Sequence, residues 1–244
     1  MPYREQPPPA GLEPWLACVW SRSGSGTVRV LPDGCVDLIA RADGSVVVAG
    51  PDTGPHLSAI QPQAPVVGVR LRPGAASAVL GVPLHALRDQ RPALADLWGE
   101  DGRRLEEALA SGGPAQAWHL VAAVAARRDA PPDPLVTAGA RHLTRFPRLR
   151  VAELAHELGL SERQLLRRFD DAVGYGPKVL ARVLRLQRLL ALPPEAGLAE
   201  AALEAGYADQ AHMSAEVRKL TGLTPAALRA EHVRFAQDVL AGAA

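Results

Sequence analysis

Two arginines four residues apart, Arg163 and Arg167, are the side chains whose type and spacing suggest a specific chemistry. Residues four apart lie on one face of a helix, so both guanidinium groups would project together. Arginine can donate two hydrogen bonds to O6 and N7 of guanine, which discriminates against other bases by roughly 1–3 kcal/mol. Gln164 lies next to Arg163 and adds a polar amide. The pattern predicts a helix that reads base edges.

A helix, a glycine turn and a second helix would hold these side chains in place. The apolar positions of the first helix are Val151, Leu154, Ala155 and Leu158. Gly159 suits the left-handed residue that ends such a helix. Ser161 is a favourable N-cap for the second helix, with Gln164 three residues later as its capping-box partner. Leu165 and Phe169 would bury the inner face of the second helix. This order of elements is typical of a helix-turn-helix motif.

The stretch Leu198–Val217 repeats the arrangement, with Gly206 in the place of Gly159. The outward positions of the first copy are Arg163, Gln164, Leu166 and Arg167, and those of the second are Ala211, His212, Ser214 and Ala215. We predict that the first copy dominates base readout, with Gln210 and His212 secondary. In the alternative, alanines of the second copy contact thymine methyl groups, so that this helix also specifies sequence.

Longer stretches carry a resemblance to a known family. The segments VAELAHELGLSERQLLRRF (Val151–Phe169) and AGYADQAHMS (Ala205–Ser214), followed by RKLTGLTPAALR, resemble the DNA-binding domain of the AraC/XylS family of transcription regulators. The resemblance covers about 100 residues, from Leu135 to Arg234. It implies two helix-turn-helix motifs joined by a long helix, Pro177 to Leu192, that reach adjacent major-groove segments of double-stranded DNA.

The resemblance also implies which residues meet DNA. The base readers would be Arg163, Gln164, Arg167, Gln210 and His212. The residues expected at the DNA backbone are Ser161, Arg168, Lys178, Arg182, Arg185, Ser214, Arg218 and Lys219. The charge distribution favours the first copy, because residues 131–198 hold 11 Lys and Arg against 7 Asp and Glu, whereas residues 199–244 hold 4 against 6.

The proline-rich segment DAPPDPL (Asp129–Leu135) predicts a boundary between two domains, residues 1–130 and 131–244. Before it, the β-branched runs TVRVL, CVDLIA, SVVVAG and PVVGVRL predict strands, with a hairpin between the second and third. From Pro73 the pattern becomes helical. The first domain is therefore expected to be α+β, a small β unit followed by helices, and the second all-α.

The overall composition excludes several protein classes. Net charge is +1 over 244 residues, and no apolar run approaches the length of a membrane span. Two cysteines, Cys18 and Cys35, provide neither a disulfide framework nor a zinc cluster. We expect a cytoplasmic protein with no membrane association, no metal and no cofactor.

The N-terminal segments LPDGCVDLIA, GVRLRPGAASAVLG and LADLWG resemble a domain that precedes this DNA-binding domain in a subgroup of uncharacterised regulators. That resemblance implies no ligand. Candidate effector-binding residues are Asp37, Trp20 and His56, since charged residues within strands sometimes line pockets. All four tryptophans fall in the first domain, where we expect them in its core or beside a pocket.

The sequence therefore predicts an effector-responsive regulator that binds promoter DNA. Its expected partners are double-stranded DNA, a small-molecule effector, RNA polymerase and a second copy of the chain. One alternative is an enzyme or thiol-reactive domain fused to a DNA-targeting domain, for which Asp33, Cys35, Asp37 and His56 are the compact candidates. Another is a DNA-binding protein whose first domain only dimerises.

Overall fold

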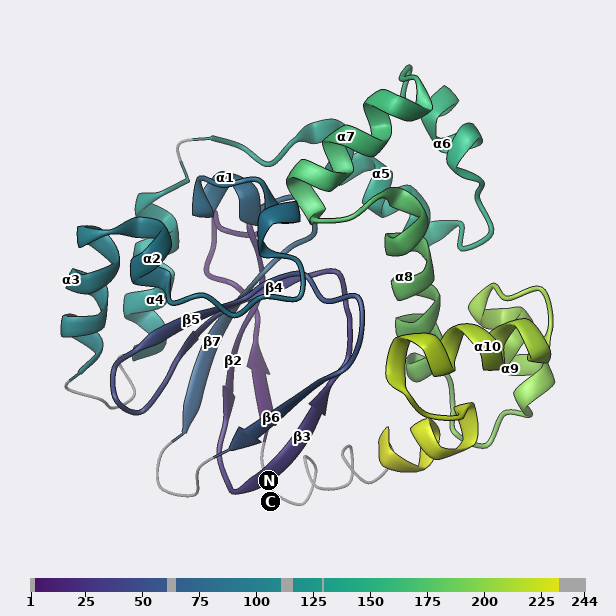
Figure 1. The fold of residues 1–244 in the computed structure, drawn as a ribbon, viewed down its shortest axis with the longest axis horizontal. Helices are drawn as coiled ribbons and strands as arrows, with labels where there is room; N and C mark the ends of the chain where they lie inside the picture. Colours follow the sequence, from purple (N-terminus) through teal and green to yellow (C-terminus); the bar gives the residue numbers. More distant parts are fainter. Residues whose placement is uncertain (1–2, 61–64, 111–115, 129, 233–244) are drawn as a thin grey trace.

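A computed structural model describes residues 3–60, 65–110, 116–128 and 130–232. Its N-terminal part contains a five-stranded antiparallel sheet in the order β1-β2-β7-β4-β5, beside a two-stranded sheet of β3 and β6 (Figure 1). The strands are β1 Tyr3–Gln6, β2 Leu16–Arg22, β3 Gly26–Val30, β4 Val36–Ala40, β5 Val46–Ala49, β6 His56–Ile60 and β7 Val66–Leu71. The four predicted strand runs correspond to β3, β4, β5 and β7.

Alternation of buried and less buried residues explains the larger sheet. On β4, Val36, Leu38 and Ala40 are buried and face the helices, while Asp37 and Ile39 point to the opposite face. The predicted hairpin is present, because β4 and β5 pair in antiparallel register from Asp37↔Ala49 to Ala40↔Val46. Gly44 has φ +85°, which suits the tight turn between these strands.

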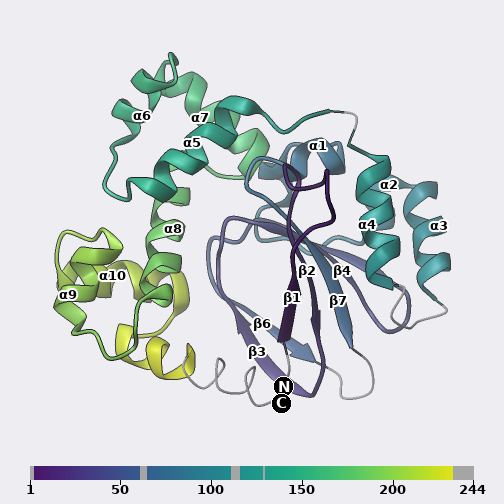
Figure 2. The ribbon, with the colours of Figure 1, turned by 180° about the vertical axis from the view of Figure 1, so that it is seen from behind.

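Short helices cover one face of the five-stranded sheet (Figures 1 and 2). They are α1 Ala76–Leu80, the 3-10 helix η1 Leu84–Leu87, α2 Leu94–Trp98, α3 Glu100–Leu109 and α4 Gln116–Ala126. Leu120, Val121 and Val124 of α4 enter the core that the sheet and these helices share. Trp20 and Trp98 are buried, but the expectation for Trp118 is wrong, because its side chain on the outer face of α4 is 62% exposed.

Among the described residues after Asp133, every regular element is a helix, which confirms the predicted all-α part. The helices are α5 Pro134–Arg145, α6 Val151–Glu157, α7 Glu162–Val173, α8 Pro177–Ala191, α9 Leu198–Ala205 and α10 Gln210–Thr221. The predicted long helix, Pro177–Leu192, is α8. Residues 233–244 of the predicted second domain lie outside the described residues.

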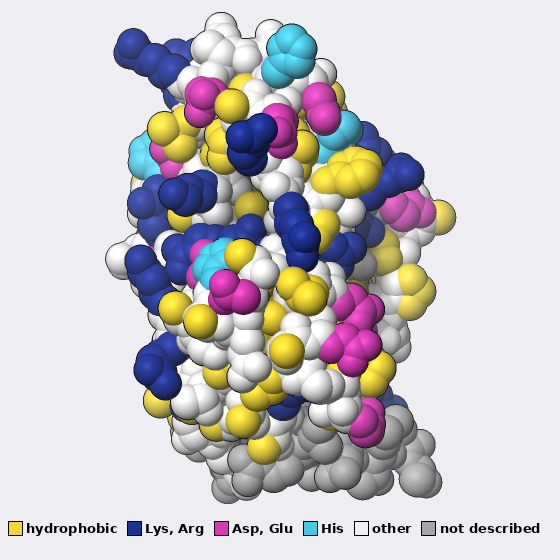
Figure 3. Space-filling view, turned by 90° about the vertical axis from the view of Figure 1, so that its right-hand side faces the viewer, with side chains coloured by type: hydrophobic (Ala, Val, Ile, Leu, Met, Phe, Trp, Pro, Cys, Tyr) yellow, Lys and Arg dark blue, Asp and Glu magenta, His cyan; other side chains and the backbone are white. Residues whose placement is uncertain are grey.

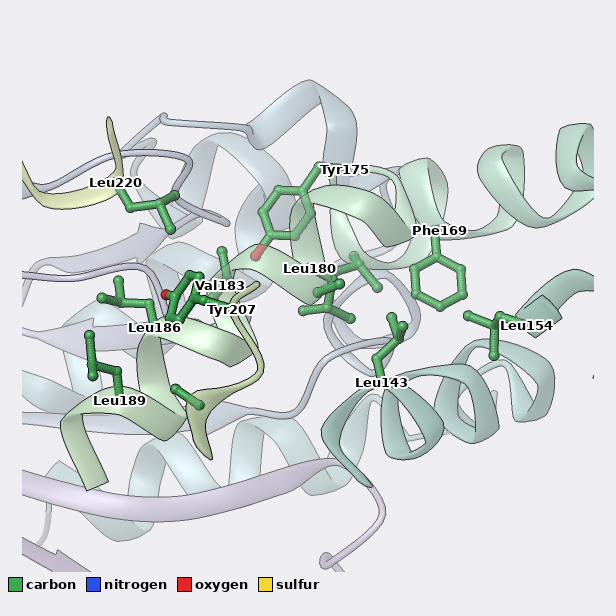
Figure 4. Close-up of a cluster of buried hydrophobic side chains, with 14 of the residues drawn as sticks. Leu143, Leu154, Phe169, Tyr175, Leu180, Val183, Leu186, Leu189, Tyr207 and Leu220 are labelled. Carbon is green, nitrogen blue, oxygen red and sulfur yellow. The ribbon is translucent and has the colours of Figure 1, made fainter. Parts of the chain in front are cut away.

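Helix α8 is the centre of the C-terminal core (Figure 4). Near its start, Leu180 packs with Phe169 of α7 and Leu143 of α5. Further along, Leu186 packs beside Tyr207, which precedes α10. Each helix-turn-helix motif is therefore fixed to a different end of α8. No helix in the described part of the chain is long and apolar enough to cross a membrane.

Candidate nucleic-acid interface

The first motif consists of α6, a glycine turn and α7. Gly159 has φ +67°, the left-handed conformation expected at the turn. The hydroxyl of Ser161 accepts a hydrogen bond from the Gln164 backbone N–H at 3.2 Å, and Oε1 of Gln164 accepts one from the Ser161 N–H at 2.9 Å. This capping box confirms the predicted start of α7. It also engages the side-chain oxygen of Gln164, which sequence reasoning assigned to base contact.

Arg163 and Arg167 lie on the exposed side of α7. Neither side chain has a hydrogen bond or an ion pair with any residue that the structure describes. Both line a groove of about 410 Å³ together with Leu166 of α7 and with His85 and Arg88 of the N-terminal part; Asp170 and Asp171 complete its lining. Lys and Arg side chains gather along the left-hand side of the molecular face that Figure 3 shows. Two uncommitted guanidinium groups on one helical face suit contact with guanine.

The second motif, α9 and α10, offers fewer free polar groups. Asp209 caps α10 by accepting a hydrogen bond from the His212 backbone N–H at 2.7 Å. Nδ1 of His212 lies 3.2 Å from the backbone N–H of Ala208, and its ring meets Tyr207 edge to face. Gln210 and the two outward alanines, Ala211 and Ala215, are exposed. Asp209 was not among the predicted site residues, although an aspartate directly before a helix is a common N-cap signal.

A half-buried cluster joins α10 to α8. The carboxylate of Glu216 lies 3.0 Å from Nε of Arg182 and 2.9 Å from Nη2 of Arg185. All three side chains are 14–17% exposed. Partial burial would raise the pKa of Glu216, but Arg185 and Arg182 outweigh it and lower the pKa. The predicted contacts of Arg182 and Arg185 with phosphate stay predictions, and they would require these ion pairs to open.

The other expected backbone contacts differ in their surroundings. Nη1 of Arg168 lies 2.6 Å from the carboxylate of Asp133, and the Ser214 hydroxyl donates to the Gln210 carbonyl at 2.8 Å. Ser161 takes part in the capping box. Of the residues expected at the DNA backbone, Lys178, Arg218 and Lys219 are exposed and have no hydrogen bond or ion pair in the described part of the chain. These three are available to phosphate groups without any rearrangement.

The candidate effector residues do not form one group. Asp37 and Trp20 both point to the face of the five-stranded sheet that is opposite the helices. Arg70 holds Asp37 through two hydrogen bonds of 3.0 and 3.1 Å. Burial raises the pKa of Asp37 although Arg70 opposes the shift. His56 lies on the separate two-stranded sheet, where it pairs with Val30 and is exposed.

The two thiols lack the surroundings of a reactive cysteine. Burial raises the pKa of Cys18 to about 11 and that of Cys35 well above its usual value. Cys35 follows an Asp33–Gly34 turn, in which its backbone N–H donates to the Asp33 carboxylate at 2.8 Å. Within the described residues, no group of three His, Cys, Asp or Glu side chains is placed to hold a metal ion.

Protein-family comparisons match two separate segments of the chain. Residues 154–231 match the helix-turn-helix domain family, and residues 4–93 match a domain of unknown function, DUF6597. No curated protein shows a significant match.

Among solved structures, ToxT from Vibrio cholerae has 10% identity and a TM-score of 0.46, over 95% of this chain and 99% of that chain. A ToxT structure with a bound unsaturated fatty acid has 14% identity and a TM-score of 0.43, over 86% and 93%. Values this low do not transfer a ligand from one chain to the other.

Proposed function

Because the chain carries an AraC-type helix-turn-helix domain behind a DUF6597 domain and is a DNA-binding transcription regulator, we propose that α7 dominates its readout of bases. The family points to a regulator rather than to an enzyme. On this proposal both recognition helices enter adjacent major-groove segments of promoter DNA. Arg163 and Arg167 donate to base edges, whereas α10 contributes mainly orientation and contacts to the backbone.

The proposal rests on one observation: equivalent positions of the two recognition helices differ in residue type and in the partners that they already have. On α7 these positions hold two exposed arginines with no partner among the described residues. On α10 they hold Ala211 and Ala215, and the neighbouring His212 is already engaged by Ala208 and Tyr207. A free guanidinium loses no internal partner on binding DNA, while His212 would have to exchange one.

On the second helix, Gln210 is the exposed polar side chain nearest to the helix start, so we assign it a secondary base contact. Arg218 and Lys219 lie in the last turn of α10 and would meet phosphate groups. Phosphate contacts hold a protein in register without selecting a sequence. The second motif would then fix the position of the first.

A selection of duplexes from a random pool by the full-length protein tests the proposal. We expect a motif with one strong half and one weak half. Arg167→Ala should relax base preference in the strong half and cost about 1–3 kcal/mol there, whereas His212→Ala should change preference little. Arg104→Ala, which removes the same charge from exposed α3, is the matched control. Equal relaxation by the Arg167 and His212 variants would contradict the proposal.

The salt dependence separates this proposal from simple charge attraction. Loss of a phosphate contact, as in Lys219→Ala, should weaken binding to all duplexes alike and reduce the salt slope by about one. Binding of the wild-type chain with no selected motif, vanishing as salt rises, would leave only attraction to phosphate and would overturn base readout altogether.

We further propose that the N-terminal domain, residues 1–130, responds to a small-molecule effector at the sheet face that carries Asp37 and Trp20. The support is a charged group, Asp37, whose side chain is only 14% exposed on this face and is held by Arg70. RNA polymerase and a second copy of the chain stay predicted partners. A screen of a compound library for quenching of tryptophan fluorescence would identify such a ligand. The quenching by that compound should be lost in the Asp37→Asn variant.

A further inference from the structure

The N-terminal domain touches the C-terminal end of the first recognition helix. Arg88, directly after η1, donates a hydrogen bond from Nε to the carbonyl oxygen of Gly174 at 2.6 Å. Its Nη2 atom lies 3.5 Å from the carboxylate of Asp170. Gly174 is the C-cap of α7, where backbone carbonyls have no partner within the helix. Arg88 therefore supplies a donor and a positive charge to the negative end of this helix.

A second arginine of the same domain does the same at the second recognition helix. Arg29 of β3 donates from Nη1 to the carbonyl oxygen of Thr221 at 3.3 Å, and its Nε lies 3.2 Å from the Glu231 carboxylate. Thr221 is the last residue of α10. In the repeat, Gly222 corresponds to Gly174, so the two arginines reach carbonyls at neighbouring positions of equivalent helices.

The intervening helix α8 is held by the same domain. Nε2 of Gln187 donates to the Pro32 carbonyl at 2.7 Å. A Cβ atom on Gly34 would lie 2.9 Å from Cδ1 of Leu180, so the loop after β3 packs closely on the start of α8. The N-terminal domain thus contacts α7, α8 and α10, and Figures 1 and 2 show it lying alongside all three.

Through these contacts the N-terminal domain connects the two helix-turn-helix motifs to each other. Without them, the two motifs would be joined through α8, which has 15 residues and a length of about 22 Å, and through the loop before α6, where Arg148 donates to the carbonyls of Leu203 and Tyr207. A bend in α8, or a rotation of either motif on it, would change the distance between the recognition helices. DNA offers successive major-groove segments at a fixed repeat of about 34 Å. The separation and angle of α7 and α10 decide which spacing of half-sites the protein accepts.

We infer that Arg88 and Arg29 determine the half-site spacing, because each fixes the C-terminal end of one recognition helix to the N-terminal domain. The inference rests on the proposed binding of DNA through both motifs. Both arginines are positioning residues: they hold helices, and base contact is left to the outward side chains of α7 and α10. An N-terminal domain without direct base contacts would in this way still contribute to sequence preference.

The test measures affinity of the full-length protein for the duplex that the wild-type chain selects from a random pool, and for versions with one or two base pairs inserted or deleted between the half-sites. Arg88→Gln, Arg29→Gln and the double variant are compared with Arg104→Gln. That control removes one positive charge from exposed α3 of the same domain. A ratio of affinities between spacings is insensitive to the amount of folded protein.

We expect wild type and Arg104→Gln to bind the selected spacing far better than altered spacings. Each test variant should lose about three- to tenfold in affinity for the selected spacing and should lose less for altered spacings. The profile of affinity against half-site spacing would therefore flatten. The double variant should flatten it further. An unchanged profile, or tighter binding at the selected spacing, would overturn the inference while leaving DNA binding intact. Absence of selective binding by wild type would instead contradict the proposed function.

Discussion

The carboxylate of Glu216 lies 2.9 Å from Nη2 of Arg185, and this ion pair joins the second recognition helix to α8. Arg182 completes the cluster from one turn earlier on α8. Because the three side chains are largely shielded from water, removal of the single carboxylate would leave two guanidinium groups close together without a counter-charge. Glu216 therefore helps to position α10, together with the buried side chains of Met213, Val217 and Leu220.

Glu216→Gln should therefore lower the free energy of unfolding at pH 7 by about 3 kcal/mol, as measured by urea denaturation. Glu153→Gln is the control, since Glu153 forms an exposed ion pair with Arg150 at the surface. Its substitution should cost much less than that of Glu216, because solvent screens an exposed pair. Equal effects of the two changes would show that the Glu216 cluster contributes no more than a surface pair.

The same carboxylate gives the stability a pH dependence of known sign. The pKa of Glu216 in the folded chain is below its ordinary value of 4.5. Its contribution is therefore complete above about pH 4.5 and is lost as the pH falls through the folded pKa. The difference in unfolding free energy between wild type and Glu216→Gln should shrink as the pH falls below 4.5. A difference that grows below pH 4.5 would contradict this assignment.

The N-caps of the recognition helices allow a direct comparison of the two motifs. Ser161 caps α7, and Asp209 caps α10. Replacement of either by alanine leaves a helix N–H without its partner and should cost about 1 kcal/mol. Urea denaturation measures both costs. If neither variant loses stability, the caps are replaced by water at no cost, and the register of the helices does not depend on them.

Features set by neighbouring residues were predictable from the sequence. The capping box follows from Ser161 and Gln164, which are three residues apart, and the β4–β5 hairpin follows from the alternation around Asp43–Gly44. Strand β1, Tyr3–Gln6, was missed because its residues carry no strand pattern. It exists because its backbone pairs with β2 from Tyr3↔Arg22 to Gln6↔Val19.

Contacts between distant residues were not predictable in the same way. Arg182 and Arg185 look like part of a basic helical face, and only the fold brings Glu216 of another helix beside them. The loop and strand sequences around Arg88 and Arg29 carry no pattern that predicts a contact with a distant helix. Their carbonyl partners lie 86 and 192 residues further along the chain, and a backbone carbonyl leaves no signature in side-chain chemistry.

The two thiols, Cys18 and Cys35, should be inert in the native protein. With a pKa of about 11, Cys18 would be thiolate in only about one molecule in a thousand at pH 8. We expect a chromogenic disulfide reagent at pH 8 to react slowly with native protein and to titrate both cysteines promptly in guanidinium. Prompt reaction of one thiol in the native protein would revive the thiol-reactive alternative for the N-terminal domain.

Alanine substitutions at the C-cap glycines of the two recognition helices distinguish local backbone strain from contact between the domains. Gly174 and Gly222 have similar φ values, +92° and +73°, so alanine at either position pays a left-handed backbone cost of about 1 kcal/mol. At Gly174, however, the added Cβ would collide with the Pro51 ring and lie 3.0 Å from the Leu84 carbonyl oxygen. At Gly222 it would meet no atom within 4 Å.

Gly174→Ala should therefore destabilise the chain by at least about 1 kcal/mol more than Gly222→Ala in urea denaturation. The excess arises where α7 meets the N-terminal domain, so Gly174→Ala should also displace Arg88 from its carbonyl partner. Its preference among half-site spacings should weaken as it does in Arg88→Gln, whereas Gly222→Ala should keep more of the wild-type preference. Equal destabilisation by the two substitutions would show that α7 does not pack on the N-terminal domain in solution as it does in this structure.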